Sequence, residues 1–252
     1  MRNIRIILEF DGRNYAGWQS QPNRPTVQSA VAAALQKVLG KKLTVSGCGR
    51  TDAGVSARNY VANFHTDSAI PLERLRMALN CELPQDILVK SAEEVSPDFH
   101  ARYRAKSKTY VYRIIRGRSP LRQHHAWEFR YPLNPVRMRQ VAKLFIGHHD
   151  FQPFCQTKAK NGYCRITSIR VKVSGDELLV TVRGNRFLYK MVRRIVGALV
   201  AYGTGRLTQE DIKAALAGKL SKSFPTAPAQ GLVLDSVDYN ENPINQKSET
   251  RG

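Results

Sequence analysis

One carboxylate in this sequence stands in surroundings that suit chemistry. Asp52 lies in the heptapeptide Gly49-Arg50-Thr51-Asp52-Ala53-Gly54-Val55, between two glycines and two residues after Arg50. Glycines let a loop bend sharply and let another chain come close to its backbone. If the loop is locally extended, Arg50 and Asp52 point the same way, because side chains i and i+2 share a face. A nearby guanidinium keeps a carboxylate ionised, so Asp52 can act as a nucleophile, a base or a ligand-binding anion.

A structural role for the same residues is the alternative. Asp, Thr and Gly are common turn residues, and an aspartate in a turn often hydrogen-bonds to its own backbone. Composition alone favours this turn interpretation. The choice between turn and reactive group therefore depends on the rest of the chain.

The elements around the heptapeptide must hold it in place. Residue patterns predict a strand at residues 43–45 and another at residues 60–65, so the heptapeptide is expected to join two strands. Over the first hundred residues the predicted order is strand, helix, strand, strand, helix, strand. That is the split βαβ pattern of a ferredoxin-like domain.

The second half begins with a cation-rich segment. Residues 102–115 are predicted to form one long strand, in which four cations share a side with two tyrosines: Arg102, Arg104, Lys106, Lys108, Tyr110 and Tyr112. Cations bind phosphates and aromatic rings stack on exposed bases, so this face suits RNA.

Two later segments carry further expectations. Residues 147–162 are expected to form a loop. Residues 187–202 are predicted to form an apolar helix with one polar stripe, on which Lys190, Arg193, Arg194 and Gly197 lie. Lys190 and Arg194 are expected at the surface, whereas Arg193 is expected to need a partner, because burying an unpaired charge is costly.

Charge is distributed unevenly along the chain. The net charge is +20; residues 1–100 carry 12 Lys+Arg and 10 Asp+Glu, whereas residues 101–252 carry 28 and 10. The second part therefore holds nearly all of the excess. An excess of this size indicates a polyanionic partner, either nucleic acid or an anionic membrane surface, rather than an ordinary solvated face.

Other features bear on the choice of partner and compartment. The apolar run at residues 195–202 is too short to span a bilayer, and the N-terminal residues are typical of a strand rather than a signal peptide. We therefore expect nucleic acid, no membrane and a cytoplasmic protein. The four cysteines form no Cys-x-x-Cys pair and are expected to be free thiols. The adjacent pairs His124-His125 and His148-His149 lack ligand spacing, so no metal is expected.

The heptapeptide is one of five blocks that carry a family resemblance. The others are residues 11–28, with Gly17-Trp18-Gln19; residues 99–112, with Phe99-His100-Ala101-Arg102; residues 187–197; and residues 231–239. In this order, the five blocks resemble the tRNA pseudouridine synthase A family and extend over nearly the whole chain. One short motif is weak support, whereas five in order are specific.

The resemblance implies an isomerase that converts uridine to pseudouridine in the anticodon stem-loop of tRNA, at tRNA positions 38 to 40, and that forms a homodimer. The reaction breaks the C1′–N1 bond, turns the uracil and joins C5 to C1′. No electrons or atoms are exchanged with another molecule, so no cofactor is expected. Glycosidases use a second carboxylate to activate water. A single carboxylate with cationic and aromatic neighbours suits isomerisation better than hydrolysis.

The resemblance also implies roles for four residues. It assigns the reacting carboxylate to Asp52 and places Tyr110 against the uracil, which must leave the RNA stack. Arg50 is expected to fill the space left in the RNA or to orient Asp52. Arg193 matches the helix arginine that pairs with the carboxylate. The chain departs from the family at Ser56, where a histidine is common.

The implied fold is α+β: two ferredoxin-like halves form a shared, mostly antiparallel sheet, with helices on one face and a basic active-site cleft between the halves. The expected boundaries are residues 1–100 for the N-terminal domain, 101–239 for the basic C-terminal domain and 240–252 for a disordered polar tail.

Two other functions stay open at this point. A non-catalytic RNA-binding or RNA-chaperone protein needs only the basic surface. A pseudouridine synthase acting on another RNA needs the same residues as one acting on tRNA. Whether Asp52 attacks the sugar C1′ or the base C6 is also left open.

Overall fold

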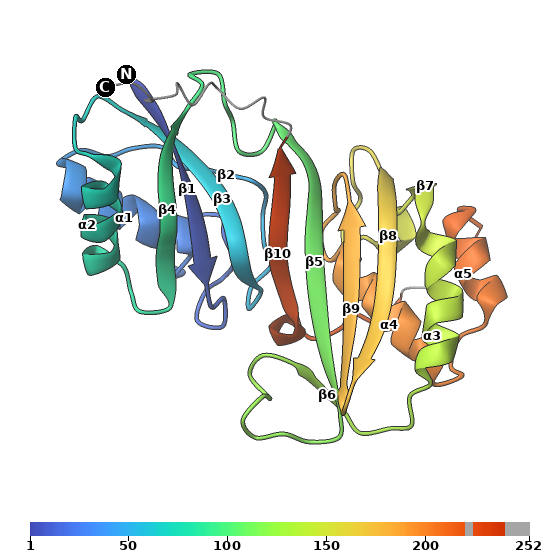
Figure 1. Cartoon of the computed structure of the whole chain (residues 1–252). Helices are drawn as coiled ribbons and strands as arrows, with labels where there is room; N and C mark the ends of the chain where they lie inside the picture. The colour runs from blue at the N-terminus through green and yellow to red at the C-terminus, as the bar shows by residue number, and fades with distance from the viewer. Residues whose placement is uncertain (220–223, 240–252) are drawn as a thin grey trace, which may run out of the picture.

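One large sheet organises the computed structural model, which describes residues 1–219 and 224–239 (Figure 1). Its strands follow the order β4-β1-β3-β10-β5-β9-β8-β7, with β2 on β3 and β6 on β5. Pairing is antiparallel except for β3–β10 and β5–β6. The α+β class and the mostly antiparallel sheet are therefore confirmed. The strands are β1 (Arg2–Phe10), β2 (Ser46–Gly47), β3 (Ser56–Thr66), β4 (Ile87–Val95), β5 (Ala105–Arg116), β6 (Trp127–Phe129), β7 (Gly147–Asp150), β8 (Tyr163–Ser174), β9 (Glu177–Gly184) and β10 (Leu232–Tyr239).

The helices begin where the sequence supplies caps. Thr26 caps α1 by accepting from the Ser29 backbone N–H, and Thr208 caps α5 in the same way through Asp211. Gly40 ends α1 in the left-handed conformation. The helices are α1 (Val27–Leu39), α2 (Leu72–Glu82), α3 (Pro135–Ala142), α4 (Met191–Gly203) and α5 (Gln209–Leu216); short 3₁₀ turns are η1 (Lys143–Phe145), η2 (Gln152–Phe154) and η3 (Ala229–Gly231).

Alternating apolar residues fix which face of the sheet is covered. In β1 the side chains of Ile4, Ile6 and Leu8 are fully buried, whereas those between them are polar or partly exposed. Figure 1 shows α1 and α4 behind the strands, one under each half of the sheet. Burying each such aliphatic side chain contributes about 1.5–3 kcal/mol, so this face holds the core.

The last strand joins the two halves of the sheet. In Figure 1, β10 (dark red) lies between β3 and β5. Leu234 pairs with Ala57 on one side and with Tyr110 on the other. Asp235 strengthens the junction: its carboxylate accepts from Arg58 Nη1 at 2.6 Å and its carbonyl from Asn59 Nδ2 at 2.8 Å. The strand that follows the heptapeptide is thus fixed two strands away from Tyr110.

Several predicted boundaries were wrong, for physical reasons. Residues 43–45 are not a strand, because the Val45 carbonyl accepts from the Gln28 side chain at 2.8 Å, and β2 begins only at Ser46. The late helix begins at Met191 instead of residue 187, because Lys190 has a left-handed φ of 60°. Within residues 147–162, predicted as a loop, the chain forms β7 and η2.

The predicted face of four cations is also wrong. Residues 100–104 form a turn in which the Arg104 N–H donates to the His100 carbonyl at 3.0 Å, so β5 begins only at Ala105. A bulge at Lys106 then interrupts the pairing with β10. Of the four cations, Lys108 alone shares regular alternation with Tyr110 and Tyr112.

Two further expectations concern membrane-spanning helices and the C-terminal tail. No helix in the described ranges, 1–219 and 224–239, is long and apolar enough to cross a membrane. The expected disordered tail at residues 240–252 lies outside the described residues.

Candidate active site

The heptapeptide forms a tight loop between β2 and β3. The Val55 N–H donates to the Asp52 carbonyl at 3.2 Å, which closes a turn around the carboxylate-bearing residue. The Tyr60 hydroxyl donates to the Gly49 carbonyl, and the Trp18 ring stacks on Tyr60 with centroids 4.2 Å apart. Trp18 is a buried core residue, so the core supports the loop.

The N-terminal signature, the block at residues 11–28, packs against this loop. The Gly54 N–H donates to the Tyr15 carbonyl at 3.2 Å. Gly17 has a φ of 96°, and a Cβ on it would lie 2.3 Å from the Thr51 carbonyl oxygen. A residue with a side chain cannot adopt this conformation without strain and cannot approach so closely. The two distant sequence blocks therefore form one structural unit around Asp52.

Asp52 meets Arg193 across the junction of the sheet. Arg193 Nη1 lies 3.0 Å from Asp52 Oδ2, and the two side chains are 13% and 14% exposed. Arg193 Nε donates to the Ala227 carbonyl at 2.7 Å, and the Ala227 N–H donates to the Arg193 carbonyl at 3.1 Å. The carboxylate is thus held by a guanidinium that is itself fixed in place. This contact goes beyond the simple turn interpretation of Asp52.

Tyr110 completes the group. Its ring is buried and meets Phe187 edge-on with centroids 5.1 Å apart. Burial raises the pKa of the Tyr110 phenol, and the negative charge of Asp52 acts in the same direction. The phenol therefore keeps its proton at neutral pH and can donate a hydrogen bond. Tyr112 is buried beside it and donates to the Pro228 carbonyl at 2.7 Å.

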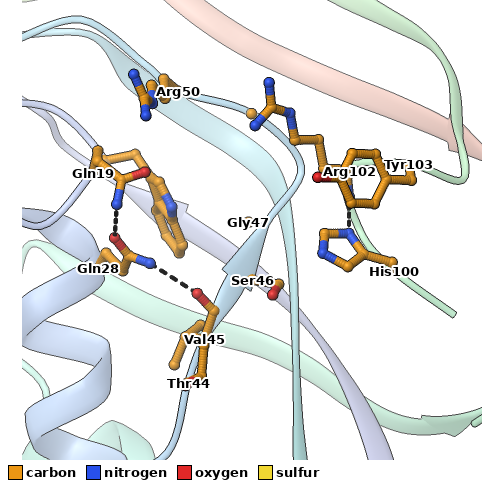
Figure 2. A pocket seen from close by; sticks show the side chains of 12 residues that line it. Gln19, Gln28, Thr44, Val45, Ser46, Gly47, Arg50, His100, Arg102 and Tyr103 are labelled. Carbon is orange, nitrogen blue, oxygen red and sulfur yellow. Dashed lines mark hydrogen bonds between the residues drawn. The ribbon is translucent and has the colours of Figure 1, made fainter. Parts of the chain in front are cut away.

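Arg50 lies apart from this group. Its side chain is exposed and lines a pocket of about 220 Å³ together with Arg102 (Figure 2), a pocket that Asp52 and Arg193 do not line. Within the described residues, Arg50 forms no ion pair with Asp52. The structure thus pairs Asp52 with Arg193, places Tyr110 where the Asp52 charge acts on its phenol, and leaves Arg50 at a neighbouring opening.

The expectation for Arg194 is wrong. Its side chain is 9% exposed, and it donates to the Cys155 carbonyl at 2.8 Å and to Gln156 Oε1 at 3.2 Å. Arg194 therefore ties the segment after η2 to the helix that carries Arg193. The polar stripe on the helix predicted a surface position for Arg194. The acceptors on Cys155 and Gln156 are distant in sequence, so no local pattern indicates them.

Lys108 is a residue that motif analysis did not assign to the site. A Cβ on Gly49 would lie 3.1 Å from Lys108 Nζ, so the ammonium group sits directly beside the start of the loop. Burial lowers the pKa of Lys108, and the charge of Arg102 lowers it further. The regular alternation of Lys108 with Tyr110 was the signal that could have identified it.

Ser56, the departure from the family pattern, has a structural contact. Its Oγ accepts from the Gly12 N–H at 3.0 Å. The residue therefore holds the N-terminal signature against the end of the loop.

The fold and the site together define a class of protein: an enzyme of strongly basic charge that presents one ion-paired carboxylate beside a protonated phenol. The tRNA pseudouridine synthase family model matches residues 6–104 and 141–240. A tRNA pseudouridine synthase A from Moorella thermoacetica is 44% identical over 243 residues, covering 94% of this chain and 99% of its own length. One from Geobacter sulfurreducens is 43% identical over 244 residues, covering 95% and 100%.

This chain belongs to the tRNA pseudouridine synthase family. The family resemblance is thereby confirmed, and the protein is an isomerase. Among solved structures, the archaeal box H/ACA sRNP Nop10-Cbf5 complex aligns with 79% of this chain and 43% of that chain, at 13% identity and a TM-score of 0.36. That similarity is too low to support an argument.

Proposed function

We propose that this pseudouridine synthase acts on uridines at positions 38 to 40 of tRNA, in the anticodon stem-loop, with Asp52 as the reacting carboxylate. One observation carries the assignment of the site: the ion pair at 3.0 Å between Asp52 and Arg193, beside the buried Tyr110. The match to the family model and the relatives named tRNA pseudouridine synthase A support tRNA as the substrate.

Each residue has a task that follows from its surroundings. Arg193 fixes the direction of the Asp52 carboxylate before substrate arrives, and preorganised charge of this kind stabilises a transition state without reorganisation. The carboxylate serves either mode of attack, on C1′ of the sugar or on C6 of the base. In both modes the C1′–N1 bond breaks and C5 bonds to C1′. The hydrogen on C5 leaves as a proton and N1 takes up a proton, so the product is an isomer of the substrate.

Tyr110 is proposed to contact the extruded uracil. The target base must leave the RNA stack, and an aromatic face replaces part of the stacking that it loses. Because burial keeps the phenol protonated, its hydroxyl can also donate a hydrogen bond to the uracil as the base turns.

We propose that two ferredoxin-like halves, residues 1–100 and 101–239, form the walls of a basic active-site cleft, with helices on one face. The strand order supports this, because the four-stranded order β4-β1-β3-β2 in the first part is matched by β10-β5-β9-β8 in the second. Asp52 comes from the first part, whereas Tyr110 and Arg193 come from the second. A homodimer and a cytoplasmic location are also proposed, from the family resemblance; light scattering of the purified protein tests the dimer.

Tritium release from tRNA labelled at uridine C5 tests the proposal directly. Wild-type protein should release tritium from positions 38 to 40, and Asp52→Asn should lower the rate at least about a thousandfold, which corresponds to about 4 kcal/mol. Binding of tRNA should be retained, because Asn keeps the side-chain shape. Asp67→Asn is the matched control, since Asp67 forms a surface ion pair with Lys41.

The outcomes separate the remaining alternatives. An Asp52→Asn protein with wild-type activity would falsify the catalytic assignment. If Asp52→Asn leaves every cellular function intact, a non-catalytic RNA chaperone is the better description. Mapping pseudouridine in cells with and without the protein distinguishes tRNA from another RNA substrate.

A further inference from the structure

A pocket of about 220 Å³ opens beside Gly49 and Arg50, and neither Asp52 nor Arg193 lines it. Figure 2 shows Gln19 and Gln28 on one wall and His100, Arg102 and Tyr103 on the opposite wall, with Arg50 at the rim. The proposed chemistry at Asp52 uses none of the residues on these two walls. The pocket therefore needs an explanation of its own.

Cations gather here without acidic partners. Arg50 and Arg102 line the pocket, and Lys108 Nζ lies beside Gly49, which also lines it. Within residues 1–219 and 224–239 none of the three forms an ion pair. The neighbouring Arg104, in contrast, is paired with Asp98. Like charges that gather without an acid repel one another, and a bound phosphate would relieve this repulsion.

An aromatic platform stands beside these cations. Tyr103 is 76% exposed, its ring lies 4.3 Å from that of His100, and the Arg102 guanidinium lies 5.9 Å from its centroid. The turn is fixed, because the Arg102 N–H donates to His100 Nδ1 at 3.1 Å. Exposed rings next to cations are the elements with which proteins bind unpaired nucleotides.

On the wall opposite Tyr103, backbone contacts determine the orientation of the Gln28 amide, which in turn orients Gln19. Gln28 Nε2 donates to the Val45 carbonyl at 2.8 Å, so Gln28 Oε1 must be the atom that accepts from the Ser20 N–H at 2.8 Å. The same oxygen accepts from Gln19 Nε2 at 3.0 Å. Gln19 therefore has its amide nitrogen engaged and its oxygen available as an acceptor at the pocket.

We propose that this pocket binds an unpaired nucleotide adjacent to the target uridine. Arg50 and Arg102 bind its phosphate, Tyr103 stacks on its base, and Gln19 Oε1 accepts from a base N–H or the ribose 2′-hydroxyl. This inference rests on the proposed function. Arg50 and Asp52 are two residues apart, so their backbones are at most about 7 Å apart, and consecutive nucleotides can occupy the two sites.

A double-mutant cycle between protein and RNA tests the proposal. Anticodon stem-loops with one abasic site on either side of the target are bound to wild-type protein and to Tyr103→Ala. Tyr103→Ala should weaken binding of the intact stem-loop about tenfold. One abasic site should weaken binding by wild type to a similar degree and have no further effect on Tyr103→Ala. The single-turnover rate at saturating protein should stay within twofold of wild type.

Charge provides the second arm of the experiment. Arg102→Ala should weaken binding and lower the slope of log affinity against log salt by about one, whereas the ion-paired Arg104→Ala should change neither. Both side chains are exposed, so both variants should melt at the wild-type temperature.

Either of two results would overturn the inference: affinities of Tyr103→Ala and Arg102→Ala within twofold of wild type, or an abasic penalty that is equal in wild type and Tyr103→Ala at every position. These results leave the proposed function standing if wild-type protein still forms pseudouridine in tRNA. Failure of the proposed function shows instead as absence of that product, or as full activity of Asp52→Asn.

Discussion

Two groups of charged residues surround the loop at residues 49–55, and they differ in whether the protein supplies them with partners. On the side of α4, Asp52, Arg193 and Arg194 are largely buried, and each has a partner within the protein. On the side of the turn at residues 100–104, Arg50 and Arg102 are exposed and, in the described parts of the chain, form no ion pair.

This difference separates residues that act on the reaction from residues that bind the RNA. Charges that are fixed by the protein before substrate arrives can act on a reaction, because they need no reorganisation. Charges left without partners are available to phosphates, and such binding weakens with salt because counterions are released. Substitutions on the α4 side should therefore change rate or stability, and substitutions on the open side should change affinity.

After Asp52→Asn, Arg193→Met should lower the reaction rate most among substitutions on the α4 side. It leaves the Asp52 carboxylate largely buried without its partner and free to rotate. We expect the single-turnover rate to fall at least about a hundredfold, with tRNA affinity nearly unchanged. The free energy of unfolding should fall by about 2 kcal/mol, less than for a fully buried pair because both groups are slightly exposed.

Arg76→Met is the control for Arg193→Met, since it breaks the surface ion pair with Glu73. It should cost less than about 1 kcal/mol of stability and leave the rate unchanged. Equal effects of the two substitutions on the rate would contradict a special role for the buried pair.

Arg194→Met should lower the stability of the protein more than it lowers the reaction rate. It removes donors from the Cys155 carbonyl and from Gln156, which then lose their partners inside the protein. We expect about 2–3 kcal/mol lower stability in urea unfolding. At a temperature where the variant is folded, the rate should fall less than tenfold. A rate loss as large as that of Arg193→Met would mean that Arg194 also determines the position of the carboxylate.

Local patterns predicted much of this fold because the relevant contacts are short in sequence. The cap at Thr26, the end of α1 at Gly40 and the alternation in β1 each depend on a few neighbouring residues. The pairing of Asp52 with Arg193 spans 141 residues and was predicted only through the family resemblance.

The wrong predictions have the opposite cause, because they depend on contacts between residues that are distant in sequence. The Gln28 side chain takes the Val45 carbonyl from a position 17 residues away and prevents a strand there. Arg194 is buried because acceptors from the segment after η2 reach it. The bulge at Lys106 depends on pairing with β10, which lies more than 120 residues later in the sequence. No pattern within one segment carries information of this kind.

Tyr110→Phe should separate stacking from hydrogen bonding. Phenylalanine keeps the aromatic face, so affinity should hold, whereas loss of the hydroxyl should slow the single-turnover rate about tenfold to a hundredfold. In wild type, burial raises the pKa of the phenol, so its proton stays bound as the pH rises from 7 to 9. The rate ratio of wild type to Tyr110→Phe should therefore be constant over this window. A ratio that falls towards one near pH 8 would show that the phenol ionises in the reaction range.

Arg50→Ala should give the smallest of these effects and bears most directly on the contrast between the two sides. Arg50 shares the loop with Asp52 but forms no ion pair with it in the described residues, so its loss should leave the saturating rate within about threefold of wild type. Affinity for tRNA should fall about tenfold at low salt, with a salt slope lower by about one. Arg58→Ala is the matched control, because Arg58 is also exposed but is paired with Asp235. If Arg50→Ala instead lowers the saturating rate as strongly as Arg193→Met, then Arg50 acts on the carboxylate during the reaction, and the division between a catalytic side and a binding side of the loop does not hold.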